Sequence, residues 1–280
     1  MNAFKSYPYM LDSHAHLDFR NFDKDRDEVL KRAEKSGIKL LINVGVDLPS
    51  SRKSIELAEK YSFIYAAVGI HPHDAAAVPS DYLQQLEEMA RHPRVVALGE
   101  MGLDFYRDRS PRSLQQEVFR GQLRLARKVN LPVIIHSRQA HDTLLKILEE
   151  EGVPPRGGVM HCFSGDLKLA EKCLKLGLYI SFAGPITYSS RNNNLSEVAA
   201  AVPLEKLLIE TDAPFLPPEP WRGKRNEPAY VLRVAEKIAS LKGVTAEEVG
   251  LKSLENAGTL FSINILAGRP STKTDENYIT

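Results

Sequence analysis

The stretch MLDSHAH, residues 10–16, joins a short apolar run to two histidines that lie two positions apart. We interpret residues 10–13 as a β-strand buried on both faces, because short continuous apolar runs are typical of parallel strands. His14 and His16 follow at the carboxyl end of this strand. Side chains two positions apart along a strand point to the same face, so both imidazoles can reach one metal ion.

Seven further apolar runs repeat this arrangement, and stretches with helical periodicity separate them. Ser110 and Pro111 predict an N-cap and a first helical residue before a helix over 114–129. Thr245 and Glu248 have the spacing of a capping box before a last helix. The eight predicted strands are 10–13, 40–44, 65–69, 95–99, 133–136, 159–161, 179–182 and 207–211.

Eight strands in alternation with helices predict an α/β protein with one closed barrel, a single (β/α)8 TIM barrel. The chain has 280 residues, and single α/β barrels of about 250 residues are common. An open, doubly wound sheet is the alternative, but it usually carries a GxGxxG or Walker A loop, and this sequence has neither. We assign residues 1–268 to the barrel and 269–280 to a polar tail, either a frayed end or a strand docked on the surface.

The composition limits the classes of function. Hydrophobic residues make up 43% and charged residues 26%, which is typical of a globular domain, and the net charge of +1 indicates that any anion site is local. No run approaches the ~18 apolar residues that cross a bilayer, and residues 1–10 lack the apolar stretch of a signal peptide. Cys162 and Cys173 lack CxxC spacing, which disfavours disulfides and structural zinc. We expect a cytoplasmic protein without a membrane span, and the sequence indicates no obligate protein partner.

Six residues that commonly bind metals lie at the carboxyl ends of predicted strands. In a barrel these ends converge on one opening, where active sites lie. A single histidine at a strand end is usually structural, but titratable groups at five strand ends are costly unless they are paired or coordinated. The joint pattern therefore predicts a metal centre formed by His14, His16, Glu100, His136, His161 and Asp212.

Four histidines and two carboxylates exceed the ligands of one tetrahedral ion, and they can hold two ions if one carboxylate bridges. Glu100 is the best bridge, because strand four lies between the two ligand groups. Mixed imidazole and carboxylate ligands suit Zn²⁺ or Mn²⁺ and tolerate Mg²⁺ when waters complete the shell. Two such ions ~3.5–4 Å apart activate a water and clamp a phosphoryl oxygen. We expect Glu100 to be shared, with His14, His16 and Asp212 in one site and His136 and His161 in the other.

Seven motifs occur in order along the chain: HAH (14–16), GIHPH (69–73), GEMGLD (99–104), HSR (136–138), HCFSG (161–165), ETDAP (210–214) and RGKRNEP (222–228). Together they resemble the TatD family of metal-dependent hydrolases and DNases, from about Leu11 to Phe261. The resemblance implies the barrel fold, a two-metal site at the six positions named above and, frequently, deoxyribonuclease activity. It implies nothing about the tail, and members of the family differ in substrate.

Two further groups lie near the expected centre. His71 follows the third strand, and Pro72 stiffens its loop. The family resemblance suggests that His71 contacts a substrate phosphate, a polar turn being the alternative; His73 is a weaker candidate. Glu210 lies two residues before Asp212 and should share its face, either supporting a ligand or the reacting water or making a structural hydrogen bond. We expect Asp212 both to bind metal and to accept the proton of that water.

Arginines near the barrel mouth are candidates for binding phosphate, because a guanidinium donates two parallel hydrogen bonds to it. They are Arg138, Arg222 and Arg225, although Glu227 could pair with one of the latter two and a solvated basic loop is the alternative. Trp221 could stack on a base. We interpret Cys162 as a core residue, because in a strand its side chain points away from that of its neighbour, His161.

Three hypotheses about function remain open at this stage. The leading one is a phosphodiesterase that acts on DNA ends or single strands, because a barrel mouth is a pit and the near-zero net charge disfavours coating a duplex. The second is an amide or ester hydrolase of the amidohydrolase type, including D-aminoacyl-tRNA deacylase. Dinuclear members of that group often bridge their metals with a carboxylated lysine on strand four, where this chain has Glu100. The third, an idle nucleic-acid-binding scaffold, is disfavoured by the intact ligand set.

Overall fold

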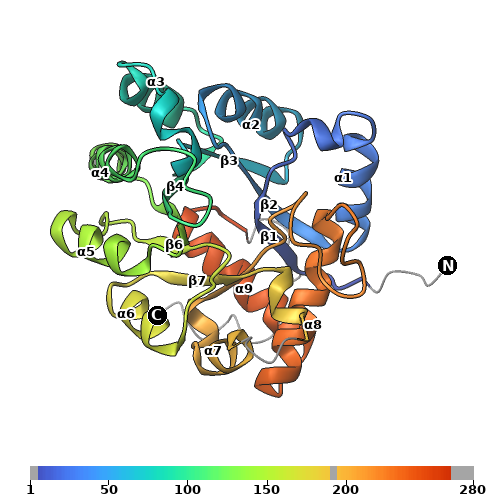
Figure 1. The fold of residues 1–280 in the computed structure, drawn as a ribbon. Coiled ribbons are helices and arrows are strands. Elements are labelled where there is room, and N and C mark those ends of the chain that lie inside the picture. The colour runs from blue at the N-terminus through green and yellow to red at the C-terminus, as the bar shows by residue number, and fades with distance from the viewer. Residues whose placement is uncertain (1–5, 190–193, 266–280) are drawn as a thin grey trace, which may run out of the picture.

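The computed structural model describes residues 6–189 and 194–265, which form one barrel of parallel strands surrounded by helices (Figure 1). All neighbouring strands pair in parallel, in the order in which they occur along the chain. The predicted tail, 269–280, lies outside the described residues. The strands are β1 (Met10–Ala15), β2 (Ile38–Val44), β3 (Ile64–Val68), β4 (Val95–Asp104), β5 (Val133–Arg138), β6 (Gly158–Met160), β7 (Tyr179–Phe182) and β8 (Leu207–Ile209).

The barrel closes between its last and first strands. Beyond β8 the chain continues beside β1, where Ala15 and Ala213 form a parallel bridge. The Asp212 N–H donates to the His14 carbonyl at 2.9 Å, and the His16 N–H donates to the Ala213 carbonyl at 2.7 Å. The prediction of a single (β/α)8 TIM barrel is confirmed, and closure aligns two predicted ligand segments side by side.

Helices form the outer ring, with strand faces and helix faces packed into one apolar core (Figure 1). The predicted capping box is present, because Thr245 Oγ1 accepts from the Glu248 N–H at 3.2 Å and Glu248 Oε2 accepts from the Thr245 N–H at 2.9 Å. No helix within the described ranges is both long and apolar enough to cross a bilayer. The helices are α1 (Arg26–Lys35), α2 (Leu48–Lys60), α3 (Tyr82–Ala90), α4 (Arg112–Val129), α5 (His141–Glu151), α6 (Leu167–Lys175), α7 (Leu195–Ala201), α8 (Val231–Lys242) and α9 (Ala246–Phe261).

The predicted start of α4 was wrong by one residue. Pro111 is the N-cap, and the helix begins at Arg112. The Ser110 hydroxyl does not cap α4; it donates to the His73 carbonyl at 2.7 Å and accepts from the Ala76 N–H at 3.1 Å. Ser110 therefore ties the loop after β4 to the loop after β3, at the end of the barrel that carries the predicted site.

The predicted end of β4 was also wrong. The strand does not stop at Gly99 but runs on to Asp104, and every one of its residues is buried. Its register against β5 shifts between Leu98 and Met101, which is the signature of a bulge. Gly99 within the bulge has a φ of +151°, and a Cβ there would lie 2.7 Å from Ile134, so glycine is needed for both conformation and space. Glu100 thus lies inside β4, and the bulge re-aims its side chain.

Candidate metal centre

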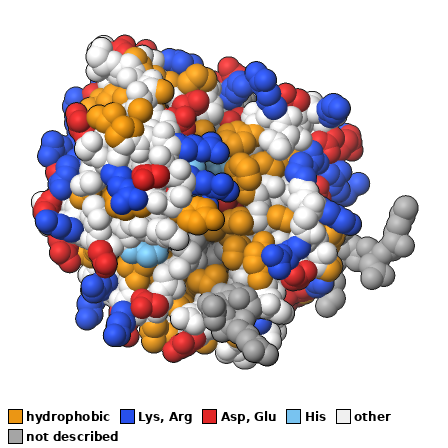
Figure 2. All heavy atoms as spheres, in the orientation of Figure 1, with side chains coloured by type: hydrophobic (Ala, Val, Ile, Leu, Met, Phe, Trp, Pro, Cys, Tyr) orange, Lys and Arg blue, Asp and Glu red, His pale blue; other side chains and the backbone are white. Residues whose placement is uncertain are grey.

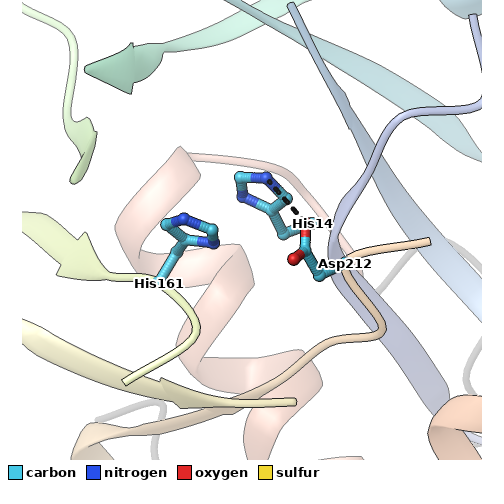
Figure 3. A group of neighbouring side chains, drawn as sticks. All are labelled: His14, His161 and Asp212. Atoms are coloured by element: carbon cyan, nitrogen blue, oxygen red, sulfur yellow. Dashed lines mark ion pairs between the residues drawn. The ribbon is translucent and has the colours of Figure 1, made fainter. Parts of the chain in front are cut away.

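The six predicted ligands converge at the carboxyl end of the barrel. Figure 3 shows three of them, His14, His161 and Asp212, pointing toward one another from β1 and from the segments after β6 and β8. Five of the six are buried and His136 is half-buried. In Figure 2, histidine atoms are visible in a hollow near the centre of this face, among basic and hydrophobic side chains.

One oxygen of Glu100 faces the first half of the cluster. Glu100 Oε2 lies 3.3 Å from His14 Nε2 and 3.6 Å from His16 Nε2. The two histidine nitrogens are 3.1 Å apart. Asp212 Oδ1 completes this half, at 3.4 Å from His16 Nε2 and 3.8 Å from His14 Nε2.

The other oxygen of Glu100 faces the second half. Glu100 Oε1 lies 2.7 Å from His161 Nε2 and 2.8 Å from His136 Nδ1. These two nitrogens are 3.2 Å apart. The rings of His14 and His161 stack with centroids 4.0 Å apart, so the two halves lie against each other. Glu100 thus directs one oxygen at each half.

Hydrogen bonds behind two of the histidines fix which nitrogen faces the cluster with a lone pair. His16 Nδ1 lies 2.7 Å from the Val44 carbonyl and must carry the proton, because a carbonyl only accepts. His161 Nδ1 lies 3.3 Å from Glu210 Oε1 in the same way. In the neutral form of each ring, the Nε2 lone pair would point at the Glu100 carboxylate, which is repulsive unless a proton or a metal ion lies between them.

The pKa values of the cluster agree with the need for a positive charge between the histidines and Glu100. Burial lowers the pKa of His161, but the carboxylates of Glu100 and Glu210 outweigh it and hold the pKa well above its usual range. Burial also opposes protonation of His16, yet Asp212 and Glu100 raise its pKa to about 9. Burial raises the pKa of Glu100, but the surrounding histidines hold it well below its usual range. The cluster favours cations, and its donors suit divalent metals.

Ligand atoms from different strands also lie close to one another. The nitrogens that face Glu100 are His14 Nε2 and His136 Nδ1; among the described residues, the opposite nitrogens of these two rings are buried without a hydrogen-bond partner. His14, His16 and Glu100 bring three ligand atoms within 4.8 Å of one another, and so do His14, His161 and Asp212. Such convergence of imidazole and carboxylate atoms fits Zn²⁺, Mn²⁺ or a hydrated Mg²⁺.

Glu210 is fully buried and lies behind His161 rather than beside Asp212. Its Oε1 accepts from the Cys162 N–H at 2.7 Å, and its Oε2 accepts from the Ser13 hydroxyl at 3.4 Å. Glu210 therefore has the position of a group that orients a ligand histidine, one of the two roles expected from the sequence.

His71 lies next to the cluster as a neutral hydrogen-bond donor. Its Nδ1 accepts from the His73 N–H at 3.1 Å, so Nε2 carries the ring proton, 3.5 Å from Glu100 Oε1. Burial holds the pKa of His71 well below its usual range. His73 is turned elsewhere, with Nε2 2.9 Å from Asp104 Oδ2. His71 therefore lies at the cluster, and His73 lies beside it.

Asp12 is a buried carboxylate that sequence reasoning missed. It accepts hydrogen bonds from the His14 N–H at 3.2 Å and from the Thr211 N–H at 2.9 Å, and from the Thr211 hydroxyl. Burial raises its pKa to about 8. Asp12 therefore joins β1 to the segment that carries Asp212. Its place in the DSHAH stretch, two residues before His14, was the available signal.

Two of the three arginines predicted to bind phosphate lie at the surface with their guanidinium groups on aromatic rings. Arg138 lies over Tyr106, with 4.0 Å between its guanidinium carbon and the ring centroid. Arg222 lies over Tyr188 at 4.4 Å and is 3.8 Å from Glu219 Oε1. Both are exposed enough to bind a phosphate.

Arg225 is engaged within the protein. Its two terminal nitrogens donate to the Asp25 carboxylate at 2.7 and 2.6 Å, and one also donates to the Asn21 carbonyl at 2.6 Å. It therefore ties the loop after β8 to the segment before α1. Glu227 pairs with Arg32, at 2.7 and 2.9 Å, and not with the arginines of its own loop as the sequence had suggested.

One further residue is partly engaged within the protein, and one expectation needs correction. Trp221 stacks on Tyr230 with centroids 4.0 Å apart, which covers one face of its ring. Cys162 is half-buried with a φ of +44°, outside a regular strand, whereas it was expected in the core. Burial raises the pKa of its thiol well above the usual range, which disfavours a nucleophilic thiolate. Cys173 on α6 is fully buried, as expected.

Histidines and carboxylates converging at the carboxyl-end mouth of a (β/α)8 barrel define a class, the metal-dependent barrel hydrolases. Similarity to known proteins narrows this class to one family. The family model described as TatD related DNase matches residues 11–262. The chain belongs to the TatD family of metal-dependent hydrolases.

Relatives in this family cover nearly the whole chain. The uncharacterized metal-dependent hydrolase YabD of Bacillus subtilis is 48% identical over 255 residues, which are 91% of this chain and 100% of that protein. The 3'-5' ssDNA/RNA exonuclease TatD of Klebsiella pneumoniae is 37% identical, over 91% of this chain and 99% of that protein. The crystal structure of YJJV, a TatD homolog from Escherichia coli K12, has a TM-score of 0.86 at 37% identity and covers 91% of this chain and 98% of that one.

Proposed function

We propose that this TatD-family chain is a phosphodiesterase that hydrolyses DNA from the 3' end of single strands. The observation that carries the proposal is the position of Glu100, whose two oxygens face two separate groups of histidines at the floor of a barrel mouth. Sites that cleave phosphodiesters commonly use two ions in this way. The name of the Klebsiella relative, a 3'-5' ssDNA/RNA exonuclease, supports the substrate and its polarity.

Six side chains would hold the ions in this proposal, with Glu100 shared. When bound, two ions of Mg²⁺, Mn²⁺ or Zn²⁺ supply Lewis acidity that polarises a phosphoryl oxygen and makes water a stronger acid. Glu210 holds His161 in position by accepting its Nδ1 proton. The ligands would be His14, His16, Asp212 and Glu100 for one ion and Glu100, His136 and His161 for the other.

The remaining steps fall to side chains around the ions. Asp212 directs Oδ1 at the histidines, which leaves its other oxygen to accept the proton of the attacking water. The Nε2–H of His71 donates to a non-bridging phosphate oxygen, because its tautomer makes it a donor. Arg138 and Arg222 bind phosphates further along the strand, and Arg225 supports the loop of Arg222 through Asp25.

A substrate panel tests the proposal against ester or amide hydrolysis. We expect single-stranded oligonucleotides with a 3' end to be shortened stepwise in the presence of Mg²⁺ or Mn²⁺, duplexes to react more slowly, and D-aminoacyl-tRNA and small amides to be inert. Turnover of the tRNA ester or of an amide without oligonucleotide cleavage would overturn the proposal. We also propose a cytoplasmic location, which the two unpaired cysteines support.

A further inference from the structure

The most exposed large hydrophobic side chains of the described residues all lie at the mouth of the barrel. They are Tyr106, Phe215 and Leu216, with 51%, 48% and 36% of their surfaces exposed. Tyr106 lies in the loop between β4 and α4, and the other two lie in the segment after β8. Figure 2 shows hydrophobic side chains beside the central hollow of this face, next to basic ones. Exposed apolar side chains around the rim of one opening indicate that the opening is a binding surface.

The two loops lie on opposite sides of the mouth. The strands are arranged β1 to β8 in order and the barrel closes between β8 and β1, so β4 and β8 are four strands apart in either direction. Tyr106 and Phe215 therefore flank the candidate metal centre from opposite sides.

Tyr106 is held close to the second half of the metal centre. Its N–H donates to Asp104 Oδ1 at 3.0 Å, and the other oxygen of Asp104 lies 3.4 Å from His136 Nε2. The guanidinium of Arg138, two residues after His136, lies over the Tyr106 ring at 4.0 Å. An aromatic ring and a cation are thus presented together: the guanidinium lies over one face of the ring, and 51% of the surface of the residue stays exposed.

Phe215 is held close to the first half. Its N–H donates to the Asp212 carbonyl at 2.8 Å, and its ring centroid lies 6.1 Å from that of His16. A Cβ at Gly184 would lie 1.9 Å from the Leu216 carbonyl oxygen. The loop that carries Phe215 and Leu216 therefore packs directly against the backbone of the turn that follows β7. The Tyr188 hydroxyl donates to the Pro217 carbonyl at 3.0 Å. The Tyr188 ring, over which the guanidinium of Arg222 lies, is therefore next to the same loop.

We propose that Tyr106 and Phe215 are stacking platforms for unpaired bases on either side of the scissile phosphodiester. This inference rests on the proposed function and deepens it, because it makes a single strand with exposed bases the preferred substrate class. Stacking tolerates any base, since every base has a π-face, and basic groups next to the rings hold the backbone. In a duplex the base faces are stacked on one another and are not available to either ring.

Substitutions at the two rings test the inference in two assays. The first assay measures, by fluorescence anisotropy, the binding of a labelled single-stranded decamer to chelator-treated protein. The second measures KM and kcat for shortening of the decamer from its 3' end. Tyr106→Ala and Phe215→Ala should each weaken binding and raise KM roughly 5- to 150-fold, while kcat changes less. Tyr106→Phe and Phe215→Tyr keep the rings and should stay close to the unaltered protein.

A second substrate isolates the contribution of the bases. A decamer with abasic residues at its 3' end keeps the phosphates but has nothing to stack, so both alanine variants should bind it as the unaltered protein does. Tyr65→Ala is the matched control variant, because Arg94 lies 3.9 Å over the Tyr65 ring at the opposite, amino end of the barrel. It should leave both decamers unaffected, with thermal unfolding used to confirm that each variant is folded.

The outcomes separate this inference from the proposed function. If KM were unchanged in both alanine variants while the unaltered protein shortened the decamer, the stacking proposal would be wrong and the proposed function would be unaffected. Equal losses on the normal and the abasic decamer would also overturn the stacking proposal, because the rings would then only support the loops. Failure of the unaltered protein to bind or cleave any oligonucleotide would overturn both. If Phe215→Ala changed the molecular mass of the assembly in solution but left KM unchanged, the surface would be an interface between copies of the chain and not a base platform.

Discussion

Replacing Glu100 with glutamine is the sharpest test of the metal centre. The substitution keeps the size of the side chain but removes its charge and turns one oxygen into an amide donor. In the structure one oxygen of Glu100 lies 2.7–2.8 Å from two of the proposed ligand nitrogens, and the other oxygen lies 3.3–3.6 Å from two more. Because one carboxylate serves both groups, we expect Glu100→Gln to weaken both ions together.

The size of the effect can be worked out from linkage. Loss of a group that merely supports a ligand costs roughly 10–100-fold in metal affinity, so loss of the shared ligand should cost at least about 100-fold for each ion. At a free metal concentration of about 100 times the dissociation constant, one ion stabilises the fold by about 2.7 kcal/mol. This corresponds to roughly 5–11 °C in Tm for a domain of this size. After a 100-fold loss of affinity, about 0.4 kcal/mol and ~1 °C remain.

The assay is the rise in Tm on adding Mn²⁺ or Zn²⁺, together with the metal content after dialysis at a fixed free-ion concentration. Glu59→Gln is the matched control, because Glu59 Oε1 also lies 3.1 Å from a histidine, His92, but at the surface. It should keep both ions and the full metal-dependent rise in Tm. Two ions at full occupancy in Glu100→Gln, or the loss of only one, would refute the shared-ligand reasoning.

Three further predictions concern residues around the ions. Asp212→Asn should lower kcat by roughly 10²–10⁴ with little change in KM, and near-normal kcat with both ions bound would show that no protein base is needed. Glu210→Gln should weaken one ion roughly 10–100-fold in titration calorimetry, whereas unchanged affinity would make its hydrogen bond purely structural. Arg222→Ala should raise KM for oligonucleotides of every sequence, and it should reduce the slope of log affinity against log salt concentration by about 0.7. Arg225→Ala should mainly lower Tm, and adding Asp25→Ala should lower Tm no further. A KM that does not depend on salt would point to an uncharged substrate.

The barrel and the convergence of the six candidate ligands could be predicted because both depend on local pattern. Titratable residues such as His14 and Asp212 stand out against apolar strands, and parallel strands of one barrel direct their carboxyl ends to one opening. The strand ends were less accurate. A glycine followed by a glutamate looked like the end of β4, but the bulge at Gly99 lets the strand continue past Glu100 to Asp104.

The roles of the surface residues could not be predicted, because they depend on partners far away in the sequence. Arg225 is paired with a carboxylate 200 positions earlier. Trp221 was a candidate for stacking on a base, and in the structure one face of its ring stacks on Tyr230. Tyr106 and Phe215 carry no motif that sets them apart, and only the fold leaves them exposed at the mouth.

The bulge in β4 links these observations. A carboxylate at the very end of a strand would contact residues of the neighbouring strands, on its own side of the mouth. Glu100 comes from β4, yet one of its oxygens faces His14 of β1 and His16 just after it, and the other faces His136 of β5. It therefore reaches across the barrel interior, along the line that joins the β4 side to the β8 side. Tyr106 and Phe215 stand at the two ends of that line, so a single strand held between the two rings would carry its backbone over Glu100.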